Sequence, residues 1–409
     1  MRRRFLNNIK SISGDNHSEY FTIEALEDGL TAKLSINACE YCVDNDGNWK
    51  SLTVNTNSIS INKEQTLSFR GNLTPTSSNG IGTFTISKKC NIKGNIMSLL
   101  YGDDFEGQTD LSGKNYAFYR LFYNCETLVS ANELVLPATT LANCCYSYMF
   151  DGCTSLIDAP ALPATTLASN CYRYMFYNCR NLVNAPALPA TTLSSYCYRY
   201  MFYNCRNLVN APALPATTLS SYCYYSMFRG CTNLVDAPEL PATTLTDYCY
   251  DTMFYGCSKL SNITILATDI SASNCLNNWV SGVSSSGTFT KHKNMTSLPS
   301  GSSGIPEGWT VVDYQDSVNL IKFYIEDEEG IHEFSCEAGM TWLDFIESKY
   351  NPTQGIVRDF KIYISGNSYI TAYHEYIGED CIINKDYDGQ YSCTTDQYID
   401  DGFTYYIRM

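Results

Sequence analysis

The chain has 409 residues, of which 44% are hydrophobic and 17% are charged, and its formal net charge is −15. This length is enough for two or three domains, and the hydrophobic content excludes a chain that is disordered throughout. The acidic balance argues against a nucleic-acid partner, which requires a clustered basic surface.

The N-terminal segment, residues 1–19, is predicted to be a solvated tail. Its Arg2, Arg3 and Arg4 form the one basic cluster, and no apolar stretch of a secretory signal peptide follows them. The sequence also lacks the roughly 18 consecutive apolar residues of a membrane span. We therefore expect a protein that stays inside the cell that makes it, or that leaves by another route, such as within an assembled particle.

Residues 20–98 are predicted to form a β-sandwich-like domain or open barrel. Segments such as FTIEAL and TLSFRG alternate polar and apolar residues, and turn signals such as Asp46-Gly47-Asn48 separate them. A cap over residues 94–119 is expected to cover the apolar edge of the segment that follows. Cys39 and Cys42 form a CxxC pair without a second pair, so we interpret them as ordinary β-domain residues rather than a metal or redox site.

A 26-residue repeat occupies the middle of the chain. Pro137, Pro163 and Pro189 recur at this interval, and the unit CYRYMFYNCRNLVNAPALPATTLSSY over residues 171–196 is identical to residues 197–222. Roughly six units run from about residue 116 to 275. One such unit cannot bury its apolar face alone, whereas stacked units can, so residues 99–315 are predicted to be a capped solenoid.

Each unit is predicted to contain a short strand and a short helix. The strand covers residues 182–189, and its prolines allow pairing into a narrow parallel sheet only where no N–H donor is needed. The helix covers residues 190–201, with Thr191 or Thr192 as its cap.

An apolar stripe is expected along this helix. Leu193, Cys197 and Met201 are spaced i, i+4 and i+8, with Tyr196 and Tyr200 beside them. Phe202 would point away from this stripe, so we expect the helix to end near Met201 and a turn to return the phenylalanine to the interior.

Two columns of cysteines follow the same period. Equivalent sulfur atoms would lie roughly 5 Å apart, the spacing of neighbouring strands, and disulfides between them would require special geometry. We therefore predict buried, reduced thiols that act as small core residues, with no cofactor and no bound metal. The columns are Cys145, Cys171, Cys197, Cys223, Cys249 and Cys275, and Cys153, Cys179, Cys205, Cys231 and Cys257.

The segments MFYNCRNL, MFDGCTSL, MFRGCTNL and MFYGCSKL resemble the BspA-like class of bacterial leucine-rich repeats. That class has an aromatic step, a small residue and a cysteine, then Ser/Asn-Leu and a proline-ended strand. Residues 278–311 resemble the closing cap of such arrays. The resemblance implies a leucine-rich-repeat solenoid and a role in adhesion or protein binding at surfaces, and similar arrays occur in phage-like particle proteins.

Residues 316–409 are predicted to form an α+β, β-grasp-like domain. The segment has 18 acidic and 6 basic residues, a net charge of −12. A hairpin around Glu329-Gly330 is followed by a predicted helix over residues 340–350, with Thr341 as its N-cap, and by further strands. The whole chain is thus expected to have a mixed β and α/β fold, with a central solenoid between two end domains.

Catalytic motifs such as GxSxG, HExxH and the P-loop are absent from the sequence in a usable context, so we predict that the protein is not an enzyme. The carboxylate pairs Asp103–Asp104 and Asp400–Asp401 fall in predicted loops and are interpreted as surface acids. The acidic segments 326–329 and 386–388 lack the spacing of a calcium loop.

The candidate partner-binding surface lies on positions that vary between repeats and are expected to point outward. Tyrosine and arginine, which are enriched at binding hot spots, recur there; a solvated surface is the alternative. These positions are Arg173, Tyr177, Arg180, Arg199, Tyr203, Arg206, Tyr225, Arg229, Asp251 and Tyr255.

The leading functional hypothesis is a recognition or adhesion protein displayed on an assembled particle such as a phage virion, as a fibre, decoration or tail component. Its partner would be a protein or glycan on a cell surface, and its end domains would contact other structural proteins. A homo-oligomer is a further expectation. The alternatives are a bacterial cell-surface adhesin, an architectural spacer, and a glycan-active enzyme in an end domain.

Overall fold

The structure is a computed structural model that describes residues 19–314, apart from 36–38, 54–57 and 78, together with the backbone of seven strands between Leu320 and Arg408. The chain divides into two compact units, Met1–Tyr314 and Gln315–Met409. The basic cluster predicted at Arg2, Arg3 and Arg4 lies outside the described residues.

The first unit begins with two sheets: the strands of the smaller one alternate buried and more exposed residues, whereas two central strands of the larger one are buried almost throughout. The larger sheet has the order β4-β3-β6-β1-β8-β9 and the smaller one the order β5-β2-β7. The strands are β1 (Phe21–Ala25), β2 (Leu30–Leu34), β3 (Cys39–Val43), β4 (Lys50–Leu52), β5 (Ile59–Ile61), β6 (Thr66–Arg70), β7 (Phe84–Ile86), β8 (Cys90–Asn95) and β9 (Leu128–Val135). Phe84 packs against Phe21 and Phe69, with ring centroids 5.4 and 5.1 Å apart. The two sheets therefore share one core and do not close into a barrel within the described residues.

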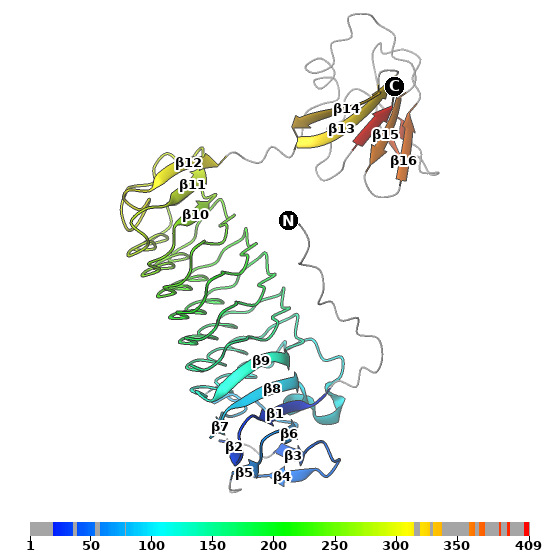
Figure 1. The fold of residues 1–409 in the computed structure, drawn as a ribbon, viewed down its shortest axis with the longest axis vertical. Helices are drawn as coiled ribbons and strands as arrows, with labels where there is room; N and C mark the ends of the chain where they lie inside the picture. Colours follow the sequence, from blue (N-terminus) through cyan, green and yellow to red (C-terminus); the bar gives the residue numbers. More distant parts are fainter. Residues whose placement is uncertain are drawn as a thin grey trace, which may run out of the picture. The chain divides into compact units, whose positions relative to one another are not determined.

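The N-terminal β-domain continues directly into the repeats (Figure 1). Strand β9 belongs to the first repeat and pairs in parallel with β8. In the core, Phe122 of the first repeat lies 5.7 Å from Phe21 and 5.8 Å from Phe84. The β-domain itself thus covers the apolar end of the solenoid, together with the short helix α1 (Ser98–Tyr101) and the 3-10 turn η1 (Gly102–Phe105).

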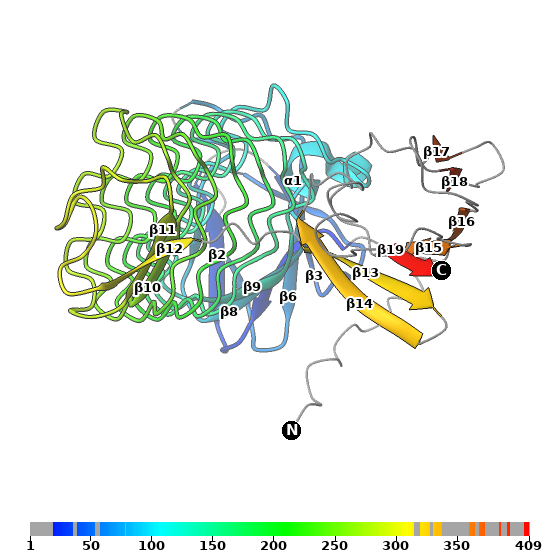
Figure 2. The same ribbon diagram turned by 90° about the horizontal axis from the view of Figure 1, so that it is seen from above.

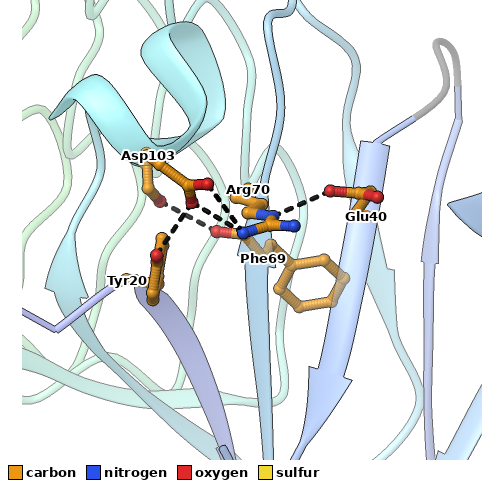
Figure 3. A network of polar contacts seen from close by, with 6 residues as sticks. Tyr20, Glu40, Phe69, Arg70 and Asp103 are labelled. Atoms are coloured by element: carbon orange, nitrogen blue, oxygen red, sulfur yellow. Dashed lines mark hydrogen bonds and ion pairs between the residues drawn. The ribbon is translucent and has the colours of Figure 1, made fainter. Parts of the chain in front are cut away.

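A polar network fixes η1 to the larger sheet (Figure 3). Arg70 donates from Nε to Glu40 at 2.7 Å and from Nη1 to both carboxylate oxygens of Asp103 at 2.7 and 2.9 Å. The Tyr20 hydroxyl donates to Asp103 at 2.8 Å, and the Trp49 ring lies under the guanidinium at 4.3 Å. Hydrogen bonds from Tyr20 and Arg70 hold the pKa of Asp103 below its usual value. This carboxylate therefore has a structural role.

The prediction of a helix in each repeat is wrong, because the chain forms consecutive tight turns there instead (Figure 2). Odd-numbered residues donate their N–H to the carbonyl three residues earlier, as Met175 does to Tyr172 at 3.1 Å. Even-numbered residues donate to the next coil, as Tyr174 does to Arg199 at 2.9 Å. Half of the backbone donors in this segment therefore hold one coil to the next.

Every fourth residue of these turns has a positive φ, as at Asn170 (59°), Tyr174 (58°) and Asn178 (59°). The resulting period of four buries two residues and points the next two outward. Phe202 is inside, as predicted, but it lies there because of this period and not because a helix ends. The buried tyrosine is Tyr198, at 1% exposure, and not a residue of the predicted stripe.

The parallel sheet predicted along the repeats has fewer hydrogen bonds than a regular sheet. Between β9 and β10 (Asn262–Ile265), the proline segments are joined by isolated parallel bridges, such as Asp158 to Asn184 and Asn184 to Asn210. Pro186 and Pro189 have no N–H to donate, which limits each segment to a few main-chain bonds with its neighbour. The solenoid is therefore held together mainly on its turn side.

Side chains of equivalent residues stack into columns through the core. One column runs from Phe122 to Phe254 and another from Phe118 to Tyr250, with ring centroids 5.4 to 5.9 Å apart. The cysteines of both columns are free thiols at 0 to 4% exposure. Thiols of the second column donate to the carbonyl of a phenylalanine in the preceding coil, as Cys179 does to Phe150 at 3.1 Å.

The array ends in a parallel sheet of β10 (Asn262–Ile265), β11 (Thr288–His292) and β12 (Thr310–Tyr314). Trp279 is fully buried and its indole N–H donates to the Gly304 carbonyl at 3.0 Å. The Trp309 indole N–H donates to the Ser284 carbonyl at 2.8 Å. The Trp279 ring lies 6.2 Å from Phe254, the last ring of the phenylalanine column, and so covers that end of the core, as a terminal cap must.

The second unit contains a five-stranded sheet of order β14-β13-β19-β15-β16 and a two-stranded sheet of β17 and β18. Strands β13 and β19 are parallel, and β13 and β14 form the hairpin expected around Gly330. The helix expected over residues 340–350 lies outside the described residues. The strands are β13 (Leu320–Asp327), β14 (Gly330–Glu337), β15 (Phe360–Ile364), β16 (Ser368–Ala372), β17 (Asn384–Lys385), β18 (Tyr391–Ser392) and β19 (Tyr405–Arg408).

Candidate functional site

The outward residues of the turns form a continuous surface of tyrosine and arginine, which we call the turn face. Its members are half-buried or exposed, while the neighbouring residues of each turn are in the core. The turn face comprises Arg120, Tyr148, Arg173, Tyr174, Tyr177, Tyr196, Arg199, Tyr200, Tyr203, Tyr222, Tyr225, Arg229, Tyr248 and Tyr255.

The tyrosines of the turn face stack on one another from coil to coil. Rings of Tyr148, Tyr174 and Tyr200 follow at centroid distances of 4.5 Å. Tyr177 and Tyr203 are 4.6 Å apart. A third column, Tyr196, Tyr222 and Tyr248, has spacings of 4.8 and 4.4 Å. Equivalent residues share one backbone conformation, so their rings project in the same direction and restrain one another's rotamers.

The arginines lie over these rings. The Arg199 guanidinium carbon is 4.7 to 5.5 Å from the rings of Tyr196, Tyr200, Tyr222 and Tyr225. Arg120 is similarly placed over three tyrosines, at 5.0 to 5.1 Å. Such cation–π contacts hold the positive charges at defined positions without neutralising them.

Two carboxylates near the turn face are buried rather than paired with these arginines. Asp151 is 8% exposed, and burial raises its pKa to about 7 although Arg120 favours the charged form. Asp251 is 3% exposed; burial raises its pKa, against the effect of a hydrogen bond from the Asn277 amide at 3.1 Å. The arginines of the turn face have no carboxylate within 4.0 Å among the described residues.

The predicted surface residues fall into three groups. Seven belong to the turn face: Arg173, Tyr177, Arg199, Tyr203, Tyr225, Arg229 and Tyr255. Arg180 and Arg206 are exposed where the turns end, one residue after the second cysteine column. Asp251 does not point outward as expected, because its side chain is buried against Asn277.

Sequence reasoning missed the columns of Tyr148, Tyr174 and Tyr200 and of Tyr196, Tyr222 and Tyr248. In a helix these positions would have flanked the buried stripe, whereas in the turns they are the outward residues with positive φ. The signal that could have found them is the strict four-residue spacing of the core residues between them.

The described residues offer no group of three or more His, Cys, Asp or Glu side chains that could hold a metal ion. Cys39 and Cys42 are both buried in β3, and the Cys42 thiol donates to Asp46 at 3.1 Å. In the described part of the chain, no helix is long and apolar enough to cross a membrane.

A family model described as the BspA type leucine rich repeat region matches residues 115–234 and 169–301, with six copies. Comparisons with curated proteins and with solved structures gave no match. Repeats of this family form generally non-catalytic proteins of the protein-binding or adhesion type, often associated with surfaces. Residues 115–301 of the chain therefore form a leucine-rich-repeat region of the BspA type.

Proposed function

We propose that the protein is a non-catalytic recognition protein that binds a macromolecule on a cell surface through its turn face. The observation that carries this proposal is the arrangement of stacked tyrosines beneath arginines that lack a carboxylate partner within the described residues. Both residue types dominate binding hot spots. Since the rings are already restrained, little side-chain entropy is lost when a partner binds.

An architectural spacer would not require this surface. Ser226 and Thr252 occupy the positions equivalent to Tyr174 and Tyr200, and their turns have the same positive φ, at 52° and 51°. The turn geometry therefore forms without a tyrosine at this position. This favours recognition over a purely structural role.

We extend the proposal to display of the protein on an assembled particle such as a phage virion. The β-domain and a β-grasp-like C-terminal unit would connect the array to other structural proteins. The support is the resemblance of the repeats to arrays in phage-like particle proteins. Mass spectrometry of purified particles from the source would detect the chain; its absence would contradict this part of the proposal.

The turn face is tested by adsorption of the labelled full-length protein to a panel of intact bacterial and animal cells. For a cell type that binds the protein, the variant R173A/Y177A/R199A/Y203A should bind at least tenfold more weakly. The control V183A/V209A changes two exposed residues of the proline segments and should bind normally. Equal binding by all three proteins would reject the turn face as the contact surface.

A further inference from the structure

Exposed charges are segregated around the coil. The turns of the three central coils carry Arg173, Arg180, Arg199, Arg206 and Arg229, and no exposed carboxylate. Exposed acids of the repeats lie instead on the proline segments, as Asp236 and Glu239 do, or in the turns of other coils, as Glu126 and Asp247 do. In a chain of net charge −15, the described repeats thus carry a cationic strip that runs along the solenoid axis.

The cations of this strip repeat at the spacing of the coils. Arg173 and Arg199 occupy equivalent positions in adjacent coils, and so do Arg180 and Arg206. Adjacent coils are joined by backbone hydrogen bonds, which sets a step of about 4.8 Å. Like charges at this distance repel, so an anion that bridges successive arginines is favoured.

The surface beside the arginines is polar. Stacking covers the faces of the tyrosine rings, so a partner meets rows of phenol hydroxyls and ring edges. Exposed aliphatic residues of the repeats lie elsewhere, on the proline segments, as at Val183 and Val209. Interfaces with folded proteins usually have an apolar centre. Rows of hydroxyl groups and cations suit a hydroxylated, anionic polymer better.

Building on the proposed function, we propose that the partner is a carboxylated polysaccharide whose chain lies along the solenoid axis. Its carboxylates pair with the arginines of successive coils, and its hydroxyl groups exchange hydrogen bonds with the tyrosine rows. The identical coils 171–196 and 197–222 present the same groups twice, which matches a ligand built from one repeating sugar unit.

The test is isothermal titration of the full-length protein with polygalacturonate, with uncharged amylose and with poly-L-glutamate. We expect polygalacturonate to bind, to weaken as salt increases, and to bind at least tenfold more tightly than either of the other polymers. Absence of polygalacturonate binding, or equal binding of amylose, would overturn the proposal. Equal or tighter binding of polyglutamate would also overturn it and would identify an acidic polypeptide as the partner class.

Two variants locate the site. The variant R173Q/R199Q should weaken polygalacturonate binding at least tenfold. The variant R180Q/R206Q should do the same; the Arg180 and Arg206 side chains are exposed and lie outside the tyrosine stacks. The matched control K88Q/K89Q also removes two exposed cations, but from the N-terminal β-domain, and should bind normally. Equal loss in the control would show an effect of net charge alone and would reject the site. If polygalacturonate does not bind but the protein still adsorbs to cells through the turn face, the carboxylated-polysaccharide proposal is wrong and the proposed function is retained.

Discussion

The thiol of Cys205 donates a hydrogen bond to the main-chain carbonyl oxygen of Phe176, 3.1 Å away in the preceding coil. Cys231 and Phe202 repeat this relationship one coil further along, at the same distance. The second cysteine column therefore supplies a small, buried donor that links each coil to the one before it.

Replacement of Cys205 by alanine removes this donor and leaves a small cavity. We expect the free energy of unfolding to fall by about 1–3 kcal/mol. Chemical denaturation measures the change. Cys144→Ala, at a half-buried position, is the matched control and should cost about 0.5 kcal/mol or less. Equal losses in the two variants would mean that the thiol donor has no special value.

Asp151 makes stability depend on pH. Its folded-state pKa of about 7 lies above the usual 3.8, so the folded protein binds this proton more tightly than the unfolded chain. The contribution is fully present below about pH 4 and is lost as the pH rises through about 7.

Asp151→Asn should therefore raise the free energy of unfolding at pH 8, by up to about 4 kcal/mol, and have little effect at pH 4. Denaturation at both pH values measures this difference. Glu126→Gln, at an exposed position, should have little effect at either pH. A gain from Asp151→Asn that is the same at pH 4 and pH 8 would contradict the burial of an ionisable carboxyl group.

Substitutions at Asn204 test the positive φ of the turns, which is 57° at this residue. Glycine stands at the equivalent position in other coils, as at Gly152 and Gly230. Asn204→Gly should therefore change stability by about 1 kcal/mol or less, whereas Asn204→Val should destabilise by about 1–3 kcal/mol because a β-branched residue is strained there. Thermal unfolding ranks the two variants. A valine variant as stable as the glycine variant would exclude the left-handed conformation.

Deletion of residues 171–196 should give a folded protein with one coil fewer, because residues 197–222 have the same sequence and recreate both junctions. Stability should decrease by the contribution of one coil and its interface. Deletion of residues 174–196 is the control; it breaks the 26-residue phase and should yield a protein that unfolds in part. Circular dichroism and small-angle scattering distinguish the outcomes, and equal behaviour of the two deletions would reject coil-to-coil registry.

The repeat, its family and the buried side of each coil could be predicted from the sequence, because a 26-residue period and the residues within it are directly visible. The backbone of the turns could not. Cys197, Met201 and Cys205 are spaced by four residues, which fits both a helix and a series of four-residue turns. The two structures differ in where residues four apart point. In a helix, four residues turn about 400°, so each such residue is rotated by about 40° from the one before, and a strict period of four does not stay on one face.

The turn face was predicted in part for the same reason. Arg173 and Tyr177 vary between repeats and were correctly expected outside. Tyr174 was not, since a positive φ is unusual for an aromatic residue and nothing local in the sequence indicates it. The conformation is stable because hydrogen bonds to the next coil and ring stacking act together, and both depend on a neighbour that is 26 residues away.

The alternation of backbone donors has a consequence for the order in which the molecule forms. A single coil can form the hydrogen bonds within its own turns, such as Met175 to Tyr172. Hydrogen bonds between coils, such as Tyr174 to Arg199, form only after the following coil is in place. The N-terminal β-domain contributes β8 as a ready template for the first repeat. Folding should therefore advance from this domain one coil at a time, in the direction of synthesis, so that a ribosome-bound chain grows on an already ordered end.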